Sequence, residues 1–142
     1  MNWLLGVSLL AETCARLDDA DSAPVLYRRL LPWAGLNAGD ATDGIRGSAS
    51  RYLGLLATTL DRFDDADSHF GDAEAANERM GARPWLACTR HDHGRMLLRR
   101  GRGADRVRAR RKIEAALRDC RELAVIAPDA PDRRAAQEAR GH

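Results

Sequence analysis

The sequence has few residues that favour β-sheets and no long apolar run. Aromatic residues account for 5% of its 142 positions, whereas Ala and Arg, which favour helices, are abundant. The apolar start, residues 3–11, has no basic segment before it and is followed by Glu12, so it predicts neither a signal peptide nor a membrane anchor. We therefore expect an all-α domain that does not associate with a membrane.

Cysteine is also scarce. The three cysteines, Cys14, Cys88 and Cys120, are odd in number and form no CxxC motif, which excludes a disulfide framework. A reducing cytoplasm is the expected location. Cys14 and Cys120 fall on the apolar faces of predicted helices, so we expect both to be buried as small apolar residues.

The first part of the chain carries a net negative charge and the second part a net positive charge. Residues 1–83 contain 8 Arg and 13 Asp and Glu, a net charge of −5, whereas residues 84–142 contain 15 Arg and Lys and 8 Asp and Glu, a net charge of +7. These sum to the net charge of +2. Such polarity favours an acidic partner at the C-terminal half or head-to-tail contact, and it is equally compatible with an uneven, solvated surface.

The apolar spacing and the Gly and Pro positions predict six helices, joined mostly by short turns. Residues 33–47 contain four glycines and predict a long loop that can hold a short turn of helix. Residues 128–142 contain two prolines and no apolar stripe, which predicts a polar, flexible tail after a domain of residues 1–127. The predicted helices are residues 3–17, 21–31, 48–60, 63–80, 84–100 and 105–123.

Small and large residues alternate along these helices at a regular spacing. Ala66, Phe70 and Ala73 stand at i, i+4 and i+7, and the same pattern occurs at residues 23–30 and 109–116. Small residues let two helices approach closely while the larger residue fills the space beside them. The residues expected to pack the helices together are Leu10, Cys14, Ala23, Tyr27, Leu53, Gly54, Ala57, Ala66, Phe70, Ala73, Gly94, Leu97, Ala109, Ile113 and Ala116.

This register resembles that of tetratricopeptide (TPR) repeats. The segments LLPWAG, SASRYLGLLATTLDRFDDADSHF, NERMGARPWLACTRHDHGRMLLRRG and RRKIEAALRDCRELA resemble the C-terminal TPR regions of bacterial LuxR-type (MalT-like) transcriptional regulators and of ATPase-linked adenylate cyclase-like proteins. The resemblance covers most of residues 30–124. Positions 91 and 93, commonly aromatic in those relatives, are His91 and His93 here.

The resemblance implies a right-handed α-solenoid of three antiparallel hairpins, residues 3–31, 48–80 and 84–123. It also implies a non-catalytic role in protein binding or assembly within transcription regulation or signalling. The sequence has no phosphate-binding GxxxxGK[ST] loop, no cyclase core and no helix-turn-helix after the repeats. The chain is thus either a piece of such a regulator or a short relative of one.

In TPR proteins the first helix of each hairpin lines a groove where partner peptides bind. On the helix of residues 84–100, His91, Arg95 and Arg99 form one stripe and, with Arg51, could hold a carboxylate. An acidic or C-terminal peptide is therefore the expected partner, and a polar face that binds nothing is the alternative. The residues expected to line the groove are Ser8, Glu12, Arg51, Leu55, Thr58, His91, Arg95 and Arg99.

Other functions are less well supported by the sequence. Cys88, His91 and Asp92 can share one helix face, but His93 points elsewhere and no further ligand is apparent, so no metal site is expected. The basic patch, residues 95–112, holds eight Arg and one Lys against one Asp and could bind nucleic acid, although no aromatic residues interleave it. The sequence contains no recognisable set of catalytic residues, so neither enzyme activity nor a cofactor is expected. His69 is predicted to be an exposed helical residue.

The first predicted helix is apolar nearly all round. Terminal repeats of a solenoid need a polar outer face, yet residues 3–10 are almost entirely apolar. A preceding helix in a larger protein or a second subunit could cover this surface. A homodimer through this face is one hypothesis, and a purely structural oligomerisation module is an alternative function.

Overall fold

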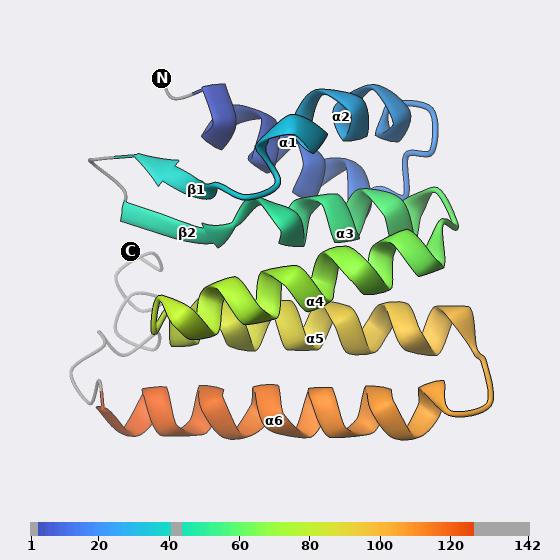
Figure 1. Ribbon diagram of the computed structural model, residues 1–142. Coiled ribbons are helices and arrows are strands. Elements are labelled where there is room, and N and C mark those ends of the chain that lie inside the picture. The colour runs from blue at the N-terminus through green and yellow to red at the C-terminus, as the bar shows by residue number, and fades with distance from the viewer. Residues whose placement is uncertain (1–2, 41–43, 127–142) are drawn as a thin grey trace, which may run out of the picture.

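The computed structural model describes residues 3–40 and 44–126, and within these ranges the fold is mostly helical (Figure 1). The predicted tail lies outside the described residues. Each predicted helix is present, with ends within about one turn of those expected. The elements are α1 (Trp3–Arg16), α2 (Ala23–Leu30), η1 (Leu31–Trp33), β1 (Asn37–Asp40), β2 (Gly44–Ser48), α3 (Ala49–Thr59), α4 (Phe63–Arg79), α5 (Arg83–Arg100) and α6 (Asp105–Ile126).

The helices pack in the order in which they occur in the chain. Each of α1 to α5 contacts its successor, and α1 also packs on α3, so that the short α2 lies beside both. Figure 1 shows α1 and α2 at one end of the stack and α6 at the other. As a result, α3 contacts both α1 and α5, which are the first helices of the pairs before and after it.

Local sequence signals account for the helix ends. Ser48 caps α3, because its Oγ accepts a hydrogen bond from the Ser50 N–H at 3.2 Å. Pro24 and Pro84 lie in the first turns of α2 and α5, where a missing N–H costs no hydrogen bond. Gly101, at a φ of 68°, takes the left-handed conformation at the end of α5.

The prediction of a long loop at residues 33–47 is wrong in part, because a β-hairpin forms there. β1 and β2 pair antiparallel, with Gly39 opposite Ile45. The hairpin is held by tertiary contacts: the Ser48 N–H donates to Asn77 Oδ1 at 3.1 Å, and Gly47, at a φ of 81°, lies against Trp85. Composition alone gave no sign of these strands, because their position depends on distant residues and not on β-propensity.

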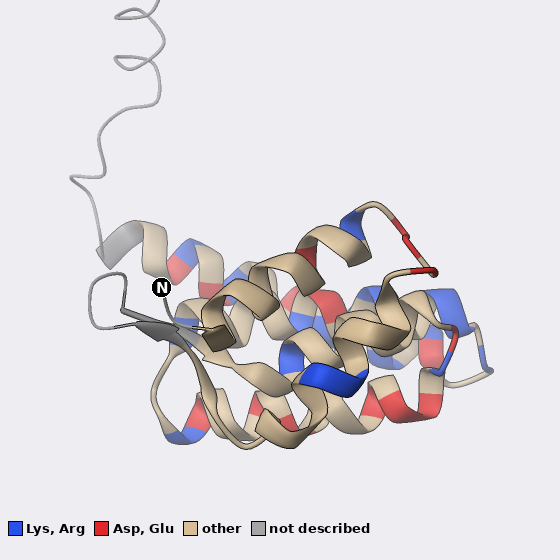
Figure 2. Ribbon diagram, turned by 90° about the horizontal axis from the view of Figure 1, so that it is seen from above, with Lys and Arg blue, Asp and Glu red and all other residues tan. Residues whose placement is uncertain are grey.

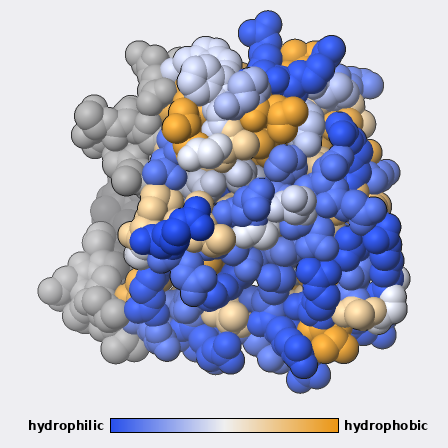
Figure 3. Space-filling view, viewed as in Figure 1, coloured by the Kyte–Doolittle hydropathy of each residue, from blue (hydrophilic) through white to orange (hydrophobic). Residues whose placement is uncertain are grey.

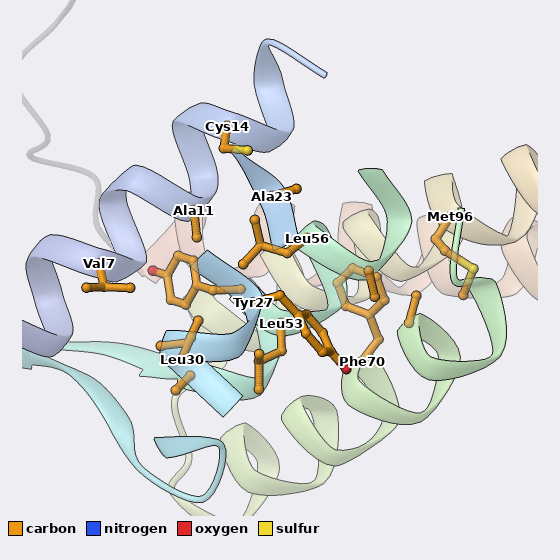
Figure 4. Close-up of a cluster of buried hydrophobic side chains, with 14 of the residues drawn as sticks. Val7, Ala11, Cys14, Ala23, Tyr27, Leu30, Leu53, Leu56, Phe70 and Met96 are labelled. Carbon is orange, nitrogen blue, oxygen red and sulfur yellow. The ribbon is translucent and has the colours of Figure 1, made fainter. Parts of the chain in front are cut away.

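The core contains the small and large residues of the predicted register. Gly54 of α3 faces Phe70 of α4 so closely that a Cβ at position 54 would lie 2.8 Å from the ring. Gly94 of α5 likewise meets Ile113 of α6, with a separation of 2.7 Å from a Cβ built there. Figure 4 shows side chains from α1, α2, α3 and α4 meeting in this core, with Phe70 among them. The predicted packing residues are buried, except Ile113, which is half-buried, and Leu10.

The prediction for Leu10 is wrong, since its side chain is 59% exposed. The buried face of α1 runs through Leu4, Val7, Ala11 and Cys14, which recur at helical spacing. An apolar run with no polar side offers several possible faces. Here the small Ala11 allows α1 to pack closely, and Leu10 consequently points away from the core.

Exposed apolar side chains gather at the N-terminal end of the molecule. Trp3, Leu10, Leu31 and Trp33 are all exposed, and the rings of Trp3 and Trp33 lie 5.4 Å apart. Figure 3 shows apolar atoms concentrated where α1, α2 and η1 lie, whereas the surface over α4 to α6 is mostly hydrophilic. We call the exposed side chains of α1 and η1 the apolar end face.

Candidate binding cleft

A cleft of about 650 Å³ opens between α1, α3, α5 and α6. Its lining includes every residue expected to face the groove except Ser8: Glu12, Arg51, Leu55, Thr58, His91, Arg95 and Arg99. Leu55, Trp85, Met96 and Leu117 give it an apolar part. The cleft therefore combines apolar surface with a row of cationic side chains.

The prediction that Ser8 faces the groove is wrong. Ser8 is 0% exposed, and within the described structure its Oγ has no hydrogen-bond partner. α1 turns residues 4, 7, 8 and 11 inward, and a small side chain at position 8 suits this close packing. The repeat register placed Ser8 on the groove face of the first helix, whereas in the structure its small size suits a buried position.

Arg51 is built into the wall of the cleft. Its Nε and Nη2 donate to Asp92 Oδ2 at 2.8 and 2.7 Å, and Nη2 lies 3.6 Å from Glu12 Oε1. The side chain is only 8% exposed, and its guanidinium lies 5.2 Å from the centre of the Tyr52 ring. Burial acts to lower the pKa of Arg51, but Asp92, Tyr52 and Glu12 outweigh it and raise the pKa. Arg51 is therefore a fixed positive charge, and its contact with Asp92 was not predicted from the sequence.

Arg95 and Arg99 differ in how strongly the protein holds them. Arg99 donates to Asp18 at 3.2 Å and to Asp61 at 3.0 Å, which links the ends of three helices. Arg95 is exposed and forms no ion pair within the described part of the chain. Nearby, His91 Nδ1 lies 3.3 Å from Asp92 Oδ1. Arg95 is thus the cation of the cleft that is most available to a ligand.

The basic patch is largely neutralised by acidic side chains of the same molecule. Arg100 and Arg108 contact Asp67 at 3.2 and 3.0 Å, Arg102 contacts Asp64 at 2.8 Å, and Lys112 contacts Glu74 at 2.9 Å. Figure 2 shows the acidic turn after α1 at the same end of the molecule as the basic turn between α5 and α6. The charge separation of the sequence therefore serves internal pairing, and few patch cations are left for phosphates.

A second cluster of polar groups lies where α4, α5 and α6 meet. His93 is buried, with Nδ1 at 2.7 Å from Glu74 Oε1 and Nε2 at 2.6 Å from Asp67 Oδ1. Its ring also stacks on Phe70, with a centroid distance of 5.3 Å. Burial acts to raise the pKa of Glu74, but hydrogen bonds from His93 and Lys112 outweigh it and lower the pKa. His93 thus fills an aromatic position and also binds two carboxylates.

The two remaining predictions about single side chains require correction. His69 is half-buried, and its Nε2 lies 2.7 Å from the Tyr27 hydroxyl, so it is not simply an exposed helical residue. Cys120 is exposed and lines the cleft, whereas Cys14 is buried, with its Sγ donating to the Asp19 carbonyl at 3.1 Å. The two errors have different causes: His69 of α4 is covered by Tyr27 of α2, whereas Cys120 is exposed because no further helix packs on α6 in the described structure.

Within residues 3–40 and 44–126, no group of three or more His, Cys, Asp or Glu side chains is arranged to hold a metal ion. No helix in these ranges is both long enough and apolar enough to cross a membrane. The chain matches no protein-family model, no curated protein and no solved structure in the comparisons made.

Proposed function

We propose that this chain is a non-catalytic, TPR-like α-solenoid module that binds an acidic protein segment in its cleft. The observation that carries the proposal is the cleft itself, which Arg95 and Arg99 line together with the apolar side chains of Leu55 and Leu117. A carboxylate can form charge-assisted hydrogen bonds with the guanidinium groups while an apolar neighbour packs beside it. The packing of α1, α3 and α5 on successive levels supports the solenoid arrangement.

The proposed setting is the cytoplasm, as part or relative of a bacterial signalling or transcriptional regulator. The support is the resemblance of residues 30–124 to the TPR regions of such regulators. Burial of the small residues at the closest approaches, Gly54 and Gly94, is what that resemblance requires. The module would supply assembly or sensing, and a catalytic or DNA-binding function would lie elsewhere.

Peptide binding is the direct test. The probe is a fluorescein-labelled peptide of alternating Glu and Leu with a free C-terminal carboxylate, titrated by fluorescence anisotropy. We expect Arg95→Glu to weaken binding at least tenfold, which is about 1.4 kcal/mol or more. The control is Arg111→Glu, which changes the charge identically at an exposed residue that does not line the cleft. Equal losses in both variants would point to a general electrostatic effect and would contradict the proposal.

Nucleic-acid binding through the basic patch is the competing function. The ion pairs of Arg100, Arg102, Arg108 and Lys112 weigh against it, because phosphates would have to displace carboxylates. A labelled oligonucleotide in the same anisotropy assay separates the two functions. Tight oligonucleotide binding that falls steeply with salt, without peptide binding, would favour the nucleic-acid function.

The apolar end face favours a further proposal, self-association into a homodimer. The exposed rings of Trp3 and Trp33 lie against each other and Leu10 is exposed on the same helix as Trp3, and exposed apolar surface of this kind marks interaction sites. Light scattering over a range of protein concentrations tests it, with Leu10→Glu as the variant expected to give a monomer. A wild-type monomer at all concentrations would remove both the dimer and the structural oligomerisation module from consideration.

A further inference from the structure

Two exposed thiols share the cleft. Cys88 of α5 and Cys120 of α6 both line it, and both are free. The third cysteine, Cys14, is buried and its thiol is hydrogen-bonded to a backbone carbonyl, so it takes no part. The cleft thus contains a pair of accessible thiols on adjacent helices, a feature that peptide binding does not use.

Contacts between α5 and α6 place the two cysteines at neighbouring levels of the hairpin. A Cβ built on Gly94 would lie 2.7 Å from Ile113 Cγ1, so residues 94 and 113 are nearly opposite each other. Because the helices are antiparallel, stepping back six residues from Gly94 to Cys88 and forward seven from Ile113 to Cys120 moves in the same direction, by about 9 and 10.5 Å. The two cysteines therefore lie within about one turn of each other along the hairpin, and Arg90, which donates to Asp119 at 2.9 Å, joins the helices near this level.

Small residues at the interface let the two helices approach closely at this level. Ala87 and Ala116 are both buried beside the cleft, and Gly94 meets Ala109 and Ile113 further along. A disulfide requires Cα atoms about 4.4–6.8 Å apart, a separation that only closely packed helices reach. Burial raises the pKa of the Cys88 thiol, Arg51 opposes this, and Asp92 and the charge of Cys120 raise it further.

We propose that Cys88 and Cys120 form a redox modification site, at which a hydroperoxide converts the two thiols into an intramolecular disulfide between α5 and α6. The Cys120 thiol gives up its proton and its sulfur attacks a peroxide oxygen; the O–O bond breaks, and the departing hydroxide takes up that proton, so that Cys120 sulfenic acid and one water are formed. The Cys88 sulfur then attacks the Cys120 sulfur while its proton passes to the departing hydroxide, the S–O bond breaks, and a second water is formed. In total two thiols and one hydrogen peroxide yield one disulfide and two waters.

The order of the two steps follows from the surroundings of Cys88. The thiolate is the form that attacks a peroxide, and burial raises the pKa of the Cys88 thiol, which disfavours its thiolate. Cys88 is therefore the resolving residue. Such a bond in a reducing compartment would be transient and would report an oxidising change at the cleft.

The test uses the full chain and hydrogen peroxide, without any peptide ligand, so that its outcome does not depend on the proposed function. We expect an intact mass lower by about 2 Da, loss of two of the three reactive thiols and a Cys88–Cys120 cross-linked peptide after digestion, all reversed by dithiothreitol. Cross-linking residues 88 and 120 should also raise the Tm by roughly 10 °C.

Variants that lack one cysteine test the role assigned to each thiol. In Cys88→Ser, sulfenic acid at Cys120 should accumulate and be trapped by dimedone, whereas Cys120→Ser should react several times more slowly. Cys14→Ala should form the disulfide as the wild type does. Oxidation of the wild type to sulfinic acid or to disulfide-linked dimers only, with no intramolecular cross-link, would overturn the proposal.

Discussion

His93 of α5 and Asp67 of α4 are joined by a hydrogen bond of 2.6 Å across the helix interface. The other ring nitrogen of His93 lies 2.7 Å from Glu74 Oε1, so that the imidazole lies between two carboxylates. The imidazole is 3% exposed and stacks on Phe70. One side chain thus combines aromatic packing with the pairing of two acidic groups, and α5 is fixed on α4 by both.

Replacing His93 with Phe should lower the free energy of unfolding by about 1–3 kcal/mol. The phenyl ring keeps the stacking but removes the His93 contact from both carboxylates, so that Asp67 keeps only its arginine partners and Glu74 only Lys112. Urea denaturation followed by circular dichroism measures the change. The control Arg110→Ala removes an exposed ion pair with Glu114 and should leave the stability unchanged. An unchanged midpoint for His93→Phe would show that the aromatic ring alone accounts for this position.

Stability should fall in acid because the folded protein holds these carboxylates ionised. Burial acts to raise the pKa values of Asp67 and Glu74, but donors including His93, Arg108 and Lys112 outweigh it, so both pKa values lie below the ordinary range. A lowered folded-state pKa contributes stability that is complete above the unfolded-state pKa of about 4 and is lost as the pH falls below it.

Thermal unfolding between pH 3 and pH 7 checks this dependence. We expect a Tm that is nearly constant from pH 7 to about pH 5 and that declines below about pH 4. Glu74→Gln should flatten the decline, since it removes one of the linked carboxylates. A variant with the same acid dependence as the wild type would exclude Glu74 as a source.

Replacing Gly54 with Ala should be destabilising by about 1–3 kcal/mol, because the new methyl group would lie 2.8 Å from the Phe70 ring. Gly71 is the matched control, being a helical glycine of α4 with no atom within 4 Å of its built Cβ. Gly71→Ala should be stabilising by about 0.5–1 kcal/mol through helix propensity. Chemical denaturation of both variants measures the contrast, and equal shifts would exclude close helix contact at Gly54.

We expect the hydrogen bonds of Asn77 to hold the β-hairpin against α4 and α5. Its Oδ1 accepts from the Ser48 N–H and its Nδ2 donates to Thr89 Oγ1, each at 3.1 Å, in a fully buried position. Asn77→Ala should cost about 2–4 kcal/mol, since both partners lose a buried hydrogen bond. Hydrogen exchange should show faster exchange of the Ser48 amide, and Glu78→Ala, exposed on the same helix, should show neither effect.

The candidate cleft could be predicted only in outline. The stripe of His91, Arg95 and Arg99 follows from their spacing on one helix, and all three line the cleft. The sequence could not show that Arg51 is held by Asp92, a residue 41 positions away, or that Ser8 is buried. Both depend on how far each helix turns about its axis, which packing decides.

The sequence by itself determined the helices. Residues with strong helix propensity, Pro24 and Pro84 in first turns and Gly101 at a helix end act within a few positions of each other, so their effects can be read locally. The tertiary structure alone decided the rest: the β-hairpin, the outward turn of Leu10 and the pairing of Asp67 with bases of α5 and α6. These arise from contacts between residues far apart in the chain, whose free energies depend on burial and distance and not on local conformational preference.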